Sequence, residues 1–141
     1  MTKQVIKNIV VSTITHIILC VFTRILLAIT WSSSNSINLA IIFYVHVLLS
    51  IINPLLYYLC GRYFMQNTLN RKNNIQSVAI LPIIILCAFI PIGLTDWLIA
   101  SVSVIASLVA HSVGILGVLL SALFPSIVLY VGIISQKKKI V

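Results

Sequence analysis

The chain has 141 residues, of which 61% are hydrophobic and 7% are charged, and nine Lys and Arg stand against a single acidic residue. Its mean hydropathy is +1.21. A soluble domain of this size cannot bury so much apolar side chain, so the composition excludes that class and predicts a protein embedded in lipid. The apolar runs are about 20 residues long and do not alternate with polar residues, which predicts transmembrane helices.

The net charge of +8 does not predict a nucleic-acid-binding protein. Eight of the nine Lys and Arg flank the apolar runs, and Arg24 is the one that lies inside a run. This distribution is typical of residues that orient a protein in a membrane. We therefore expect no nucleic-acid partner.

The first two helices are expected over residues 9–29 and 37–60, on either side of the polar stretch 32–38. The first run lacks a cleavage site of small residues at a suitable distance, and Arg24 interrupts it. We therefore expect an uncleaved first helix and not a secretion signal.

The third helix is expected over residues 77–93, after a polar segment at 61–76. The chain then stays apolar from residue 97 to residue 134. As one helix, that run would reach about 57 Å across a hydrocarbon core of about 30 Å. Two alternatives remain open: a long, tilted helix bent near Pro125, or a re-entrant piece over residues 97–110 before the last span.

Positive residues cluster at the N-terminus, in the middle segment and at the C-terminus, whereas the other two loops have none. The positive-inside rule places these three segments in the cytoplasm and requires an even number of spans. The predicted fold class is an all-α integral membrane protein of four transmembrane helices, multi-pass in the plasma membrane. Its single membrane domain, 1–141, consists of a hairpin at 8–60, a cytoplasmic loop at 61–76, a second hairpin at 77–135 and a basic tail at 136–141.

Two sequence matches indicate that the hairpins are tandem and similar. Residues 48–61 (LLSIINPLLYYLCG) and 119–132 (LLSALFPSIVLYVG) share Leu-Leu-Ser, a Pro and a final Gly at the same spacing. Residues 17–22 (IILCVF) return at 84–89 as IILCAF. Either an internal repeat with an axis along the membrane normal or a chance match between Ile- and Leu-rich segments explains this agreement.

Arg24, His46 and Asp96 form the candidate intramembrane polar site. Arg24 and His46 are expected at similar depths in neighbouring helices, and Asp96, the only acidic residue, at the outer end of the third. A charge in lipid needs a partner or access to headgroups. Either Arg24 and Asp96 form an ion pair or an outward-facing anion site, or Arg24 reaches the headgroups while Asp96 caps a helix.

The three histidines do not predict a metal site. His16, His46 and His111 lack the spacing of metal ligands, and a lone acidic side chain excludes catalysis by paired carboxylates. We expect no enzyme activity, no metal and no cofactor. Each His is expected to bond to a carbonyl or hydroxyl group on a neighbouring helix.

A row of small residues with alternating steps of three and four, here called the small-residue seam, predicts a helix-packing surface. Its members are Ala100, Ser103, Ser107, Ala110, Gly114, Gly117 and Ser121. Pro54 and Pro125 are candidate hinges, because a Pro inside a helix removes one backbone hydrogen bond.

Residues 53–57 (NPLLY), followed by 61–64 (GRYF), resemble the seventh-helix NPxxY motif and short eighth helix of G-protein-coupled receptors. The resemblance covers only these two stretches. The chain is too short for seven helices, and further spans follow the motif where that family has a tail, so no function is carried over.

Two function classes remain. The first is a non-enzymatic accessory, assembly or immunity-type subunit that acts through helix–helix contacts with another membrane protein or with itself. Its basic cytoplasmic segments would also bind anionic lipid headgroups. The alternative is a small transporter or channel subunit that works as an oligomer. The small number of intramembrane carboxylates disfavours proton- or sodium-coupled transport. We therefore rank the accessory-subunit class above the transporter or channel class.

Overall fold

The computed structural model describes residues 3–32, 39–67, 70–92 and 115–136. Over these residues the chain is helical and has no strand, so the all-α prediction is confirmed. The helices are α1 (Lys3–Ser32), α2 (Leu39–Tyr63), α3 (Arg71–Ile92) and α6 (Ile115–Ile134).

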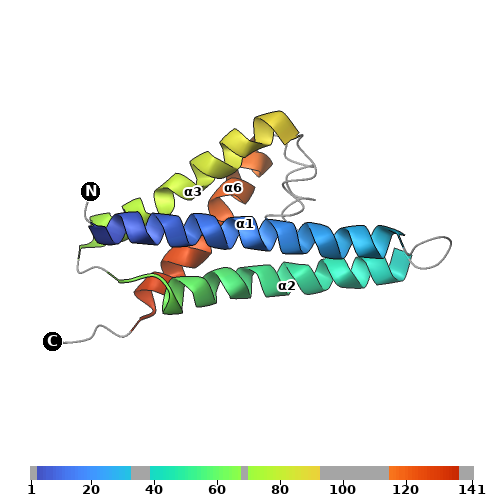
Figure 1. Ribbon diagram of the computed structural model, residues 1–141, viewed down its shortest axis with the longest axis horizontal. Coiled ribbons are helices and arrows are strands. Elements are labelled where there is room, and N and C mark those ends of the chain that lie inside the picture. Colours follow the sequence, from blue (N-terminus) through green and yellow to red (C-terminus); the bar gives the residue numbers. More distant parts are fainter. Residues whose placement is uncertain (1–2, 33–38, 68–69, 93–114, 137–141) are drawn as a thin grey trace.

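The four helices within the described residues pack as a ring. α1 contacts α2 and α3, and α6 contacts α2 and α3. α1 and α2 run antiparallel as one hairpin, and α3 and α6 form the second pair (Figure 1). The two pairs lie close together at the end where α1 and α3 begin, and they diverge toward the opposite end (Figure 1).

The helix bounds differ from the expected ones at the polar segment between α2 and α3. α2 continues to Tyr63, and α3 begins at Arg71, so part of the predicted loop is helical. The early start of α3 has a local cause in Asn70, whose side-chain Oδ1 accepts a hydrogen bond of 2.9 Å from the backbone N–H of Lys72. An Asn in this position is a favourable helix N-cap.

Both candidate hinges lie inside uninterrupted helices. Pro54 lies within α2 and Pro125 within α6. The side chain of Pro125 is fully buried, whereas that of Pro54 is half-buried. A hinge at either residue stays a prediction.

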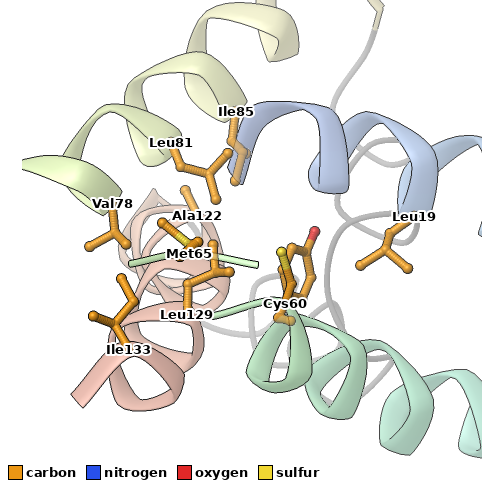
Figure 2. Packing of buried hydrophobic residues seen from close by; sticks show 10 residues of the cluster. Leu19, Cys60, Met65, Val78, Leu81, Ile85, Ala122, Leu129 and Ile133 are labelled. Carbon is orange, nitrogen blue, oxygen red and sulfur yellow. The ribbon is translucent and has the colours of Figure 1, made fainter. Parts of the chain in front are cut away.

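The hydrophobic core lies where α3 and α6 meet the end of α2. Leu81 of α3 and Leu129 and Ile133 of α6 are completely buried. Figure 2 shows these side chains gathered around Met65, which follows α2 in the chain. The core therefore holds the ring together at the end where the two helix pairs are close.

Polar side chains lie inside this ring, and many large apolar side chains lie outside it. Asn8, Ser12 and Ser77 are 0% exposed, whereas Ile18 is 60% and Ile51 64% exposed. Exposed large apolar residues occur on all four described helices. By length and composition, the stretch Lys3–Thr30 of α1 is able to cross a membrane, and in α6 the described apolar stretch Ala122–Ile134 is shorter.

Candidate functional site: a buried polar row beside a glycine crossing

One face of α1 carries a line of buried polar residues, here called the polar row. It consists of Asn8, Ser12, His16 and Thr23. The first three are spaced by four residues, which places them above one another on a helix. The same face also buries Leu19 and Cys20, so the row is embedded in the contact of α1 with its neighbours.

His16 is the centre of the polar row. Its Nδ1 lies 2.7 Å from the hydroxyl oxygen of Tyr57 on α2, and its Nε2 lies 3.5 Å from Sγ of Cys20. In the neutral tautomer that carries its proton on Nε2, the Tyr57 hydroxyl donates to Nδ1 and both ring nitrogens have a partner. The expectation that a His bonds to a hydroxyl on a neighbouring helix is confirmed for His16.

Two further polar contacts join α1 to α2. The hydroxyl of Thr15 lies 2.9 Å from Sγ of Cys60, and Nδ2 of Asn53 donates to Oγ1 of Thr23 at 3.1 Å. Oδ1 of Asn53 and Oγ of Ser126 are buried side-chain atoms that have no hydrogen-bond partner within the described parts of the chain. Polar pairs thus hold the first hairpin together between residues 15–23 of α1 and residues 53–60 of α2.

Replacing Tyr57 by Phe removes the hydroxyl group that faces His16. We expect the free energy of unfolding in detergent to fall by about 0.5–1.5 kcal/mol, the range for hydrogen bonds between membrane helices. Tyr63→Phe is the matched control, because the side chain of Tyr63 is exposed. Equal stability of the two variants would show that the contact between His16 and Tyr57 does not hold the hairpin.

A second polar cluster, here called the amide clamp, joins the chain segments at the close end of the ring. Its members are Asn8, Gln66, Asn67, Asn74, Ser77 and Gln136. Nδ2 of Asn8 donates to the carbonyl oxygen of Gln66 at 2.9 Å and to Oγ of Ser77 at 3.3 Å, and its Oδ1 accepts from the N–H of Gln66 at 2.9 Å. This one side chain therefore links α1 to the α2–α3 connection and to α3.

Gln136 has the equivalent role at the end of α6. Its Nε2 donates to the carbonyl oxygens of Gly61 at 2.8 Å and Met65 at 2.7 Å. Its Oε1 accepts from the backbone N–H of Asn67 at 3.1 Å. The bond to Gly61 reaches a carbonyl group in the last turn of α2, where carbonyl groups lack an intrahelical partner, and the other two bonds hold the segment that follows α2.

α2 and α6 cross at two glycines, and we call this contact the glycine crossing. A Cβ atom on Gly61 would overlap the carbonyl oxygen of Leu129, and one on Gly132 would overlap that of Tyr58. The Cα of Gly132 lies 3.2 Å from the position that a Cβ of Gly61 would take. Only glycine at both positions lets the two backbones approach so closely.

The structure describes only part of the predicted polar site. Arg24 lies in α1 with an exposed side chain. His46 belongs to α2, but its side chain is outside the described part, and Asp96 lies outside the described residues altogether. The pairing of Arg24 with Asp96 stays a prediction.

The small-residue seam also falls mostly outside the described residues. From Ala100 to Gly114 it lies in the stretch 93–114, which the structure does not describe. Gly117 and Ser121 belong to α6, but the surroundings of these two residues are not described. The seam and the alternatives for residues 97–110 stay predictions.

Sequence reasoning missed the polar row, the amide clamp and the contact between the glycines. The signal for the row was present, because Asn8, Ser12 and His16 repeat at a spacing of four inside an apolar run. Among the described residues, no group of three or more His, Cys, Asp or Glu is placed to hold a metal ion.

Comparison of the chain with protein-family models, with curated proteins and with solved structures found no match.

Proposed function

We propose that the chain is a small multi-pass membrane protein of four spans that acts without catalysis, as an accessory, assembly or immunity-type subunit. It works through helix–helix contacts with another membrane protein or with a second copy. Both termini and the α2–α3 connection lie on the cytoplasmic side of the plasma membrane.

The observation that carries this proposal is the inverted distribution of side chains. The polar row and Ser77 are buried, while large apolar residues such as Ile14, Ile83 and Ile127 are about half exposed or more. In water such a surface is unfavourable, because each exposed apolar side chain forgoes burial. In lipid the same surface is solvated, and the interior polar groups hold the helices together.

The charges at the close end of the ring support the orientation. The start of α1, the end of α2 and the start of α3 lie together there (Figure 1). Their exposed cations are Lys3, Lys7, Arg62, Arg71 and Lys72. Arg62 donates to the hydroxyl of Tyr58 at 3.2 Å, and its Cζ lies 5.5 Å from the ring centre of Tyr63. Such a rim suits anionic lipid headgroups on the cytoplasmic face.

The small-residue seam provides the test of the partner. We expect the native protein, purified from its membrane in mild detergent, to carry a stoichiometric second membrane protein or a second copy in native mass spectrometry. The double variant Gly114→Leu, Gly117→Leu should lose that partner, because bulky side chains prevent close helix approach. Leu120→Ala is the control, since Leu120 is an exposed residue of α6. Retention of the complex by the double variant would contradict the proposal.

The polar row favours one alternative, a small transporter or channel subunit that works as an oligomer. Ionisable and polar residues inside a membrane bundle often line a substrate or ion path. In this function the predicted site of Arg24, His46 and Asp96 would face the path. Arg24→Leu should then reduce flux in liposomes, or resistance in cells, at normal expression, whereas Ile25→Leu should not. Undiminished flux in the Arg24 variant would remove this assignment.

A further inference from the structure

The contacts of the glycine crossing are reciprocal. Gly61 meets the backbone of Leu129, and Gly132 meets the backbone of Tyr58. Gly61 and Gly132 are the last residues of the two similar stretches, 48–61 and 119–132, and Tyr58 and Leu129 stand at the same place within them. Each glycine therefore contacts the residue that is equivalent to the one contacting the other glycine. Such a reciprocal contact defines an isologous interface.

We infer that the glycine crossing is an isologous interface between two copies of one helical hairpin, and that the glycine face of each hairpin binds a second hairpin of the same kind. The order of contacts around the ring agrees with this inference. α1 packs on α3 and α2 on α6, so each helix meets its counterpart, while α1·α2 and α3·α6 are the contacts within the hairpins.

The chemistry of the crossing explains how a second copy of the first hairpin would fit there. The atoms that approach each glycine are backbone atoms: carbonyl groups, the Cα of the other glycine and the N–H of Arg62. The different side chains of Tyr58 and Leu129 therefore do not enter the contact at its closest point. In lipid, where apolar burial gives little drive for association, close backbone packing is what selects the partner.

This inference goes beyond the proposed function, because it concerns how the two halves of the chain bind each other and requires no partner protein. The test uses the full-length chain with a protease site inserted between Thr68 and Leu69. Two preparations carry different tags before α1, and they are mixed in mild detergent and then cleaved. We expect the two halves to stay associated. We also expect that purification through one tag recovers some of the first hairpin that carries the other tag.

Three comparisons make the outcome decisive. In the uncleaved mixture, any recovery of one tag with the other comes from oligomers of whole chains. Recovery of differently tagged first hairpins together must therefore be higher after cleavage than before it. Gly61→Leu in both preparations should lower that recovery about tenfold or more, because the side chain overlaps the facing backbone. Leu55→Ala, at an exposed position of α2, should leave it unchanged. Failure to recover mixed first hairpins from the cleaved wild type, or equal recovery with Gly61→Leu, overturns the inference, whereas loss of a partner protein bears only on the proposed function.

Discussion

Replacing Asn8 by Leu is expected to lower the free energy of unfolding by about 2 kcal/mol, since a buried group that loses its hydrogen bond costs about 1–3 kcal/mol. Asn8 is 0% exposed and makes three hydrogen bonds, two of them to the backbone of Gln66. Leu is similar in size but offers neither donor nor acceptor, so the N–H and carbonyl group of Gln66 lose their partner. Thermal unfolding in detergent, followed by circular dichroism, measures the change.

Gln4→Leu is the matched control for this variant. Gln4 lies one turn earlier on α1 and donates to the side chain of the same residue, Gln66, at 2.7 Å, but this bond is exposed. Water replaces such a partner, and surface substitutions usually change stability by less than about 0.5 kcal/mol. If Asn8→Leu and Gln4→Leu melt alike, the amide clamp does not stabilise the close end of the ring.

The helical class followed from the sequence because long apolar runs that do not alternate with polar residues form helices in lipid. The expected end of the third helix, at residue 93, lies outside the described residues. The start of α3 was not predicted, although Asn70 is a favourable helix N-cap, because the polar residues after it resemble a loop by composition. The burial of Asn74 in α3 was not predictable either, because its side chain donates to Asn67 in the preceding segment, a contact that the local sequence does not encode.

The candidate site was less predictable for a related reason. Charge drew attention to Arg24 and Asp96, whereas the interior of the described ring is built from uncharged polar groups such as Asn8, Ser12 and Thr23. In apolar runs these small polar residues are easily taken for ordinary membrane-helix composition. Their common face is visible from a spacing of three and four, but their partners on other helices are not.

The role of Gly61 and Gly132 was also not predictable from the sequence. Each ends one of the two similar stretches, and a Gly near the end of a helix is usually interpreted as a stop signal. In the structure both lie inside helices, and their role is the close contact of α2 with α6. The repeat was therefore visible in the sequence, but the contact between its equivalent positions required the three-dimensional arrangement.

At the glycine crossing, we expect replacement of Gly by Ala to change the free energy of unfolding in the direction opposite to the one that helix propensity gives. In an exposed helix interior, replacing Gly by Ala stabilises by about 0.8–1.0 kcal/mol, because Gly is a poor helix former. At Gly132 we expect the opposite, since a Cβ atom would overlap the carbonyl oxygen of Tyr58 and lie 3.0 Å from the backbone nitrogen of Arg62. Backbone atoms inside a helix cannot move aside as a side-chain tip can.

We therefore expect Gly132→Ala to lower the free energy of unfolding by about 1–2 kcal/mol, and Gly132→Leu by about 3 kcal/mol, the upper part of the range for overpacked sites. Both are measured by thermal unfolding in detergent. Val131→Leu, at an exposed neighbouring position of α6, should have little effect. A stabilised Gly132→Ala variant would show that helix propensity dominates at this position, and that α2 and α6 are not in backbone contact there.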